Sequence, residues 1–122
     1  MKLNQVTIVS DETKICEMRK LLEEARSDIM SMFHYGDSFD MWEYFDNWLD
    51  EVSASLAYAL ALYYKDDTFS SESCEGLNHH IEAAISGIAI TRRTVHAHDT
   101  VAMIWHDATF ALMPIESAIA CL

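Results

Sequence analysis

Residues 38–64 read SFDMWEYFDNWLDEVSASLAYALALYY, and this segment decides the fold. Its apolar residues recur at spacings of three and four, which match one face of an α-helix and not the alternation of a strand. This seam consists of Trp42, Phe45, Leu49, Val52, Leu56, Ala59 and Tyr63. We therefore predict one amphipathic helix over residues 38–64, with Ser38 as its N-cap.

Three further segments, near residues 11–33, 73–98 and 100–122, carry apolar seams of the same kind. The seam positions are Ile15, Met18, Leu22, Ala25, Ile29 and Met32; then Leu77, Ile81, Ala84, Ile88, Thr91 and Val95; then Val101, Trp105, Ala108, Leu112, Ile115 and Ile119. Four amphipathic helices with short connections predict an all-α fold. We expect an antiparallel four-helix bundle that forms a single domain over residues 1–122.

The segments between and within these helices carry their own signals. Residues 1–9 are β-prone and are predicted to form a short extended arm, with Ser10 capping the first helix. Residues 65–76 are polar and are predicted to form a loop. Gly87 is predicted to let the third helix approach the tryptophan-rich helix closely, and Pro114 to kink the last helix or open its final turns.

Composition excludes several classes of protein. The chain has 122 residues, 51% of them hydrophobic, and a formal net charge of −12, which argues against direct binding to nucleic acid or to anionic membranes. No apolar run is long enough for a transmembrane helix, and the N-terminus lacks the features of a signal peptide. Because Cys16, Cys74 and Cys121 show no metal-like spacing, we expect reduced thiols and a cytoplasmic location.

The acidic residues are concentrated in the middle of the chain. Between Arg26 and Arg92, twelve carboxylates face one lysine, a net of −11. Within the predicted helix over residues 38–64, the acids lie opposite the apolar seam, and no lysine or arginine lies three or four residues away. The predicted contact residues are Asp37, Asp40, Glu43, Asp46, Asp50, Glu51, Asp66 and Asp67.

This charge distribution predicts a non-enzymatic protein that docks its acidic face on a basic partner. Carboxylates three or four residues apart on a helix are separated by about 4.5–6 Å, comparable with phosphates along a nucleic-acid strand. The partner is therefore expected to be a nucleic-acid-binding protein or complex that this chain inhibits or regulates by charge mimicry. Small acidic proteins of phages and mobile elements that block host defence nucleases act in this way.

The sequence contains no motif that specifies a cofactor or a metal. The six histidines form no Glu-x-x-His pair of the kind that di-iron bundles use. No glycine-rich phosphate loop is present, and no cysteine is linked by spacing to a particular histidine. We expect neither a metal nor a cofactor.

One local pattern suggests an enzyme instead. Arg93 is followed after four residues by His98, which resembles the R-x4–6-H signature of HEPN-domain ribonucleases. That family consists of small helical bundles that dimerise and cleave RNA through attack of a 2′-hydroxyl. The resemblance implies that Arg93 and His98, with Arg92 and His96, would form the active site. The residue after the arginine, often Asn or Asp in the family, is Thr94.

A third alternative is a homo-oligomeric structural or assembly protein. Several large apolar residues lie off the predicted seams and would either widen the core or mark an interface. These residues are Met41, Trp48, Leu62, Phe110 and Met113. Their exposure in the folded chain separates the two possibilities.

Overall fold

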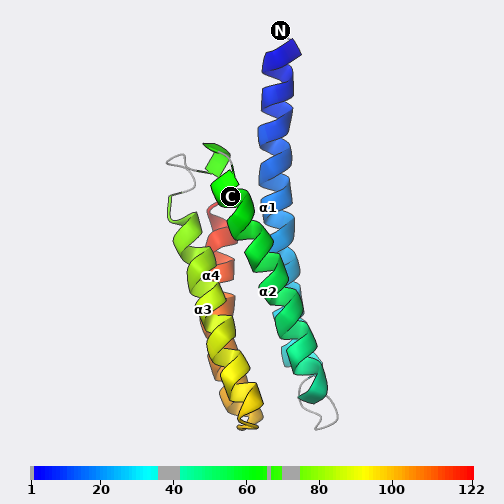
Figure 1. The fold of residues 1–122 in the computed structure, drawn as a ribbon, viewed down its shortest axis with the longest axis vertical. Helices are drawn as coiled ribbons and strands as arrows, with labels where there is room; N and C mark the ends of the chain where they lie inside the picture. The colour runs from blue at the N-terminus through cyan, green and yellow to red at the C-terminus, as the bar shows by residue number, and fades with distance from the viewer. Residues whose placement is uncertain (1, 36–41, 66, 70–74) are drawn as a thin grey trace.

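The computed structural model describes residues 2–35, 42–65, 67–69 and 75–122. This part of the chain forms α1 (Lys2–Tyr35), α2 (Trp42–Lys65), the 3-10 helix η2 (Asp67–Phe69), α3 (Leu77–His96) and α4 (Val101–Ala120). The four long helices run alternately down and up along one axis, as Figure 1 shows. The predicted antiparallel four-helix bundle is confirmed.

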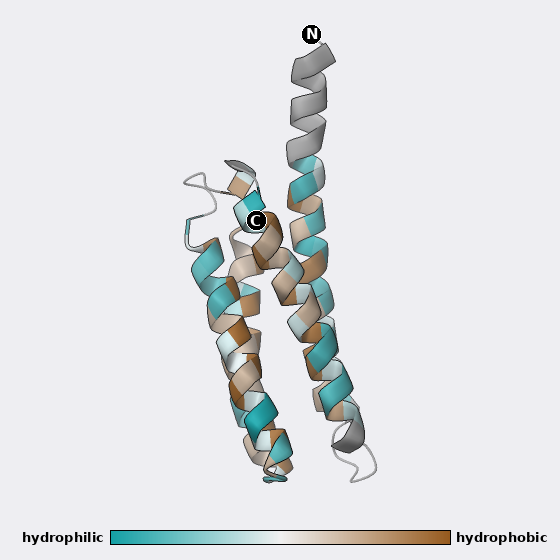
Figure 2. Cartoon of the chain, viewed as in Figure 1, coloured by the Kyte–Doolittle hydropathy of each residue, from teal (hydrophilic) through white to brown (hydrophobic). Residues whose placement is uncertain are grey.

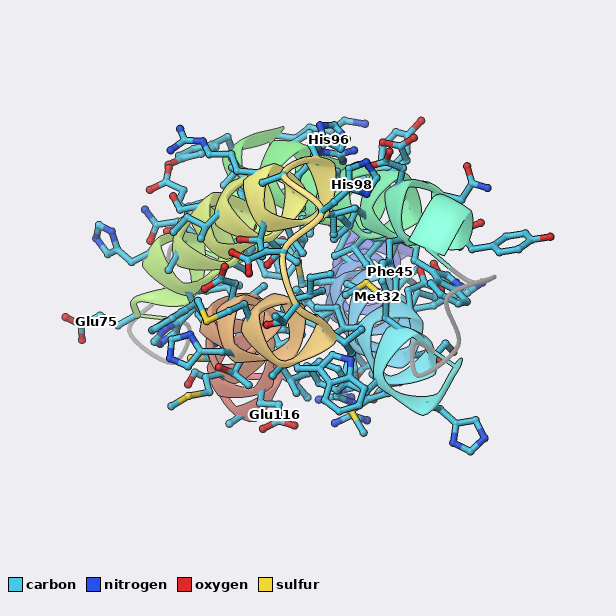
Figure 3. The ribbon with its side chains drawn as sticks, turned by 90° about the horizontal axis from the view of Figure 1, so that it is seen from below. Met32, Phe45, Glu75, His96, His98 and Glu116 are labelled. Atoms are coloured by element: carbon cyan, nitrogen blue, oxygen red, sulfur yellow. The ribbon has the colours of Figure 1, made fainter. Side chains whose placement is uncertain are left out.

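Each helix packs against its neighbours in the sequence. The pairs α1–α2 and α3–α4 are antiparallel hairpins, and contacts of α2 with α3 and of α1 with α4 close the bundle. Seen along the axis, α1 and α2 lie on one side and α3 and α4 on the other (Figure 3). The outer face of the α1–α2 hairpin is therefore directed away from that of the α3–α4 hairpin.

Most residues of the predicted seams of the first three helices lie in the core of the bundle. In α1 the fully buried residues are Met18, Leu22, Ala25, Ile29 and Met32, and in α2 they are Phe45, Leu49, Val52, Leu56 and Ala59. Every predicted seam residue of α3 is buried as well. Figure 2 shows hydrophobic and hydrophilic patches along α1, α2 and α3, as amphipathic helices require, and Figure 3 shows Met32 beside Phe45 in the core.

The predicted seam of α4 is confirmed only at Ala108 and Ile115, and the buried face is rotated from the predicted one by part of a turn. Its buried residues are Ile104, Asp107, Ala108, Ala111, Ile115 and Ala118. The larger Trp105, Leu112 and Ile119 are only half-buried. Because α4 is apolar around most of its circumference, its sequence pattern does not select one face for the core.

Close packing against α3 explains this orientation of α4. A Cβ atom at Gly87 would lie 2.6 Å from the backbone nitrogen of Ala111 and 2.7 Å from the carbonyl carbon of Phe110. Gly87 therefore serves contact with α4, not with the tryptophan-rich α2 as predicted. Small residues are needed at this crossing, so Ala111 lies against Gly87 and the larger Trp105, Leu112 and Ile119 are only half-buried.

The predicted N-terminal arm and the helix start at Ser10 are also wrong, because α1 begins at Lys2 and continues without a break past Ser10. Extending a helix by one residue costs little once a packed helix exists, whereas starting one is costly. β-branched residues prefer strands only when a neighbouring strand can pair with them. In Figure 1 this end of α1 projects beyond the other helices.

The remaining boundaries are close to those predicted. Gly76 precedes α3 with a left-handed φ of 83°, and α3 begins at Leu77, not near residue 73. Thr100 caps α4, because its hydroxyl accepts a hydrogen bond from the Met103 amide at 3.2 Å. Helix α4 continues through Pro114 to Ala120. The predicted Ser38 cap lies outside the described residues.

No helix in the described ranges is long and apolar enough to cross a membrane.

Candidate functional site

The structure describes three of the eight predicted contact side chains. Asp46, Asp50 and Glu51 lie on α2, where Asp50 and Glu51 are exposed and Asp46 is half-buried. The other five positions are Asp37, Asp40, Glu43, Asp66 and Asp67, whose side chains lie outside the described part of the chain. The three described residues do not form one surface, because they lie on two sides of α2.

Asp46 and Asp50 face α3, where Arg92 partly neutralises them. The guanidinium Nη1 of Arg92 lies 2.9 Å from Asp50 Oδ1 and 3.6 Å from Asp46 Oδ1, and its Nη2 donates to Ser53 Oγ at 3.4 Å. His96 Nε2 lies 2.8 Å from Asp46 Oδ1. These two acids therefore help to join α2 to α3, and their availability to a partner is lower than the sequence suggests.

Glu51 faces α1 and meets two further carboxylates there. Together with Glu24 and Asp28 it lines a shallow, open pocket of about 380 Å³, whose other walls are Ser27, Ala54 and Ser55. No lysine or arginine nitrogen of the described residues comes within 4.0 Å of these three carboxylates. This acidic cluster, Glu24–Asp28–Glu51, is therefore uncompensated within the described chain.

Asp28 shows the electrostatic cost of this arrangement. Partial burial of its side chain raises the pKa of the carboxyl above its ordinary value of 3.8, and the negative charges of Glu51 and Glu24 raise it further. A hydrogen bond between the Asp28 and Glu51 side chains acts in the same direction. All of these causes disfavour the ionised form, and a cation placed in the pocket would oppose them because an opposite charge favours that form.

Two exposed tyrosines flank the acidic cluster along α2. Tyr44 lies seven residues before Glu51 and Tyr58 lies seven residues after it, so all three share one stripe of the helix. Tyr58 is 68% exposed, and the Tyr44 ring lies 6.4 Å from the ring of Trp48. Tyrosine is enriched at protein interfaces, and aromatic faces attract guanidinium groups. The stripe therefore suits contact with arginine side chains.

The residues that resemble a ribonuclease motif lie near the end of α3. Arg93 and His98 are both exposed, and His98 has a left-handed φ of 51° in the turn before α4. The implied companions Arg92 and His96 both contact Asp46. Figure 3 shows His96 and His98 at this end of the bundle. The ribonuclease hypothesis stays a prediction.

A second polar cluster, which the sequence did not indicate, lies between α3 and α4. Asp107 is buried and accepts a hydrogen bond from the hydroxyl of Thr94, and His106 Nδ1 lies 3.3 Å from Asp107 Oδ1. The Thr94 hydroxyl is also 3.3 Å from the Ile90 carbonyl oxygen. These contacts give the buried Asp107 carboxylate hydrogen-bonding partners, and the contact with Thr94 joins α4 to α3.

Metal binding finds no support in the described ranges. No group of three or more His, Cys, Asp or Glu residues there is arranged to hold a metal ion. Cys16 is exposed and Cys121 is half-buried, and both are free thiols.

Comparison of the chain with models of protein families, with curated proteins and with solved structures finds no match.

Proposed function

We propose that this chain is a non-enzymatic binding protein that docks an acidic surface on a basic partner. The contact surface is the outer face of the α1–α2 hairpin, centred on the Glu24–Asp28–Glu51 cluster. The partner is a nucleic-acid-binding protein whose phosphate-binding site receives these carboxylates, so that the chain inhibits or regulates it. Glu24 and Asp28 are one turn apart, about 6 Å along the helix axis, and carboxylates at this spacing can engage groups that otherwise bind phosphates.

The observation that carries this proposal is the uncompensated acidic cluster. Like charges four residues apart on a helix lower its stability. The pKa of Asp28 is raised first by partial burial and then by the negative charges of Glu51 and Glu24. Other described acids, Asp46 and Asp50, have Arg92 within ion-pair distance. A partner that brings an arginine or lysine to the cluster would gain the Coulombic attraction that the free chain lacks.

We expect Asp28→Asn to stabilise the free protein at neutral pH. A carboxyl whose pKa is higher in the folded than in the unfolded protein stabilises the folded state below its unfolded pKa, here 3.8. That stabilisation is lost as the pH rises through the folded pKa. Asparagine avoids this loss, so the variant should melt about 2 °C higher than wild type at pH 7. The difference should vanish below pH 3.8, where Asp28 is protonated in both states.

Thermal denaturation of both proteins between about pH 3 and pH 8 measures this difference, because that range begins below 3.8, the ordinary pKa of the carboxyl. Asp50→Asn is the matched control, because its carboxylate faces Arg92 at 2.9 Å and its neutralisation should bring no gain. An Asp28→Asn variant that is less stable at neutral pH would contradict the repulsion on which the proposal depends.

Binding itself can be measured with an arginine-rich helical peptide as the probe. In a titration followed by NMR, the amide signals that shift should belong to residues 24–28 and 51–58, and added salt should weaken binding steeply. The combined variant Glu24→Gln, Asp28→Asn, Glu51→Gln should bind at least about tenfold more weakly, which corresponds to about 1.4 kcal/mol.

A second triple variant separates the cluster from overall charge. Glu12→Gln, Glu23→Gln and Glu75→Gln remove the same number of charges from exposed residues outside the cluster. This control should bind the peptide nearly as well as wild type. Equal weakening in the two triple variants would mean that net charge alone attracts the peptide, and it would refute the proposed surface.

A further inference from the structure

The outward face of α4 has almost no charge, which sets it apart from the rest of this acidic chain. Its exposed residues are Ala102, Met103, His106, Phe110, Met113, Glu116, Ser117 and Ala120. Among them only Glu116 carries a fixed charge. Phe110 is 52% exposed and Met113 is 66% exposed, and Ile90 of α3 is exposed as well. A helix that is apolar on its solvent side usually meets a second apolar surface.

We propose that this face binds the same face of a second copy of the chain, with the two α4 helices antiparallel. In a two-fold contact away from the axis, residue i of one copy meets residue j of the other, and residue j meets residue i, so each pair forms twice. With the axis near Ala111, position 106 of one helix lies opposite position 116 of the other. His106 of each copy therefore meets Glu116 of the other, and the two Phe110 rings lie beside the axis.

Charge complementarity selects this partner and this direction. Parallel packing would set His106 against His106 and Glu116 against Glu116, whereas antiparallel packing joins unlike groups. His106 Nδ1 already lies 3.3 Å from Asp107 Oδ1, so an imidazolium at this position would lie between Asp107 and the Glu116 of the second copy. Figure 3 shows Glu116 directed away from its own bundle, where a second copy can reach it.

The position of the other acids favours the same arrangement. Two chains of net charge −12 repel each other unless their contact avoids the acidic segments. Contact through α4 keeps away from the acidic α2, because α4 packs against α3 and α1 and lies diagonally across the bundle from α2. The α1–α2 surface of each copy stays open, so a dimer would present two acidic surfaces to a partner. The dimer and the acidic docking surface use different faces, so failure of either proposal leaves the other standing.

Sedimentation equilibrium of the full chain tests the dimer. We expect a mass that rises from one to two chains as concentration increases, and Phe110→Glu should raise the dissociation constant at least about tenfold. Tyr58→Glu places the same charge at an exposed aromatic residue of α2 and should leave dimerisation unchanged. Circular dichroism of each variant checks that the helices are intact.

Charge reversal tests the antiparallel pairing. His106→Glu and Glu116→Lys should each weaken the dimer, and the double variant should restore it because the pair is then reversed. A chain that stays monomeric at every concentration, or a dimer that Phe110→Glu does not affect, would refute the interface. A double variant no tighter than either single one would refute the pairing of positions 106 and 116.

Discussion

Replacing Phe69 by alanine should lower the free energy of unfolding by about 3–5 kcal/mol. Phe69 is the last residue of η2 and is fully buried, although the connection around it is polar in sequence. Its ring stacks on that of Tyr63 with 6.4 Å between centroids, and η2 packs against both α1 and α2. Alanine would remove this ring from the core and leave a cavity between the two helices.

Chemical denaturation followed by circular dichroism measures the loss. Tyr58→Ala is the matched control, because it removes an exposed aromatic ring from α2 and should change stability by about 0.5 kcal/mol or less. If Phe69→Ala were as stable as this control, Phe69 would not be part of the core, and the connection between α2 and α3 would not be anchored by it.

Gly87→Ala is the second substitution with a large expected effect, a loss of about 3 kcal/mol. The added methyl group would meet backbone atoms of Phe110 and Ala111 at 2.6–2.8 Å, and backbone atoms cannot rotate away as a side chain can. The helices α3 and α4 would have to separate along their contact. This penalty exceeds the gain of about 1 kcal/mol that alanine brings to a helix interior.

Ser86→Ala is the control for Gly87, because Ser86 is the preceding residue of α3 and is exposed. We expect the free energy of unfolding of the Ser86→Ala variant to stay within about 0.5 kcal/mol of the wild-type value in the same denaturation experiment. A Gly87→Ala variant that gained stability would show that helix propensity outweighs packing at this position and that α3 and α4 are not in backbone contact there.

Much of the fold could be predicted from hydrophobic periodicity, but only where the pattern selects one face. In α2 the seam from Phe45 to Ala59 separates apolar from charged residues, so the buried face follows from the sequence. In α4 charged residues are too few to mark the solvent side, and contact with Gly87 decides the orientation instead. Phe69 was missed because a single buried residue in a polar connection has no periodicity.

The candidate site was harder to predict because it depends on which helices are neighbours. Asp46 and Asp50 have no cation on their own helix, and only the antiparallel alignment of α2 with α3 brings Arg92 and His96 to them. The same applies to Glu51, whose companions Glu24 and Asp28 belong to α1. Sequence identified the excess of acids, and tertiary contacts determine which of them remain uncompensated.

The most direct test of the acidic docking surface is capture of a partner from nuclease-treated lysate on three immobilised baits. The baits are wild type, the cluster variant Glu24→Gln, Asp28→Asn, Glu51→Gln, and the charge-matched control Glu12→Gln, Glu23→Gln, Glu75→Gln. We predict that wild type and control retain the same basic nucleic-acid-binding protein, that moderate salt releases it, and that the cluster variant does not retain it. Retention of the same proteins by all three baits, or of partners without basic surfaces, would contradict the account.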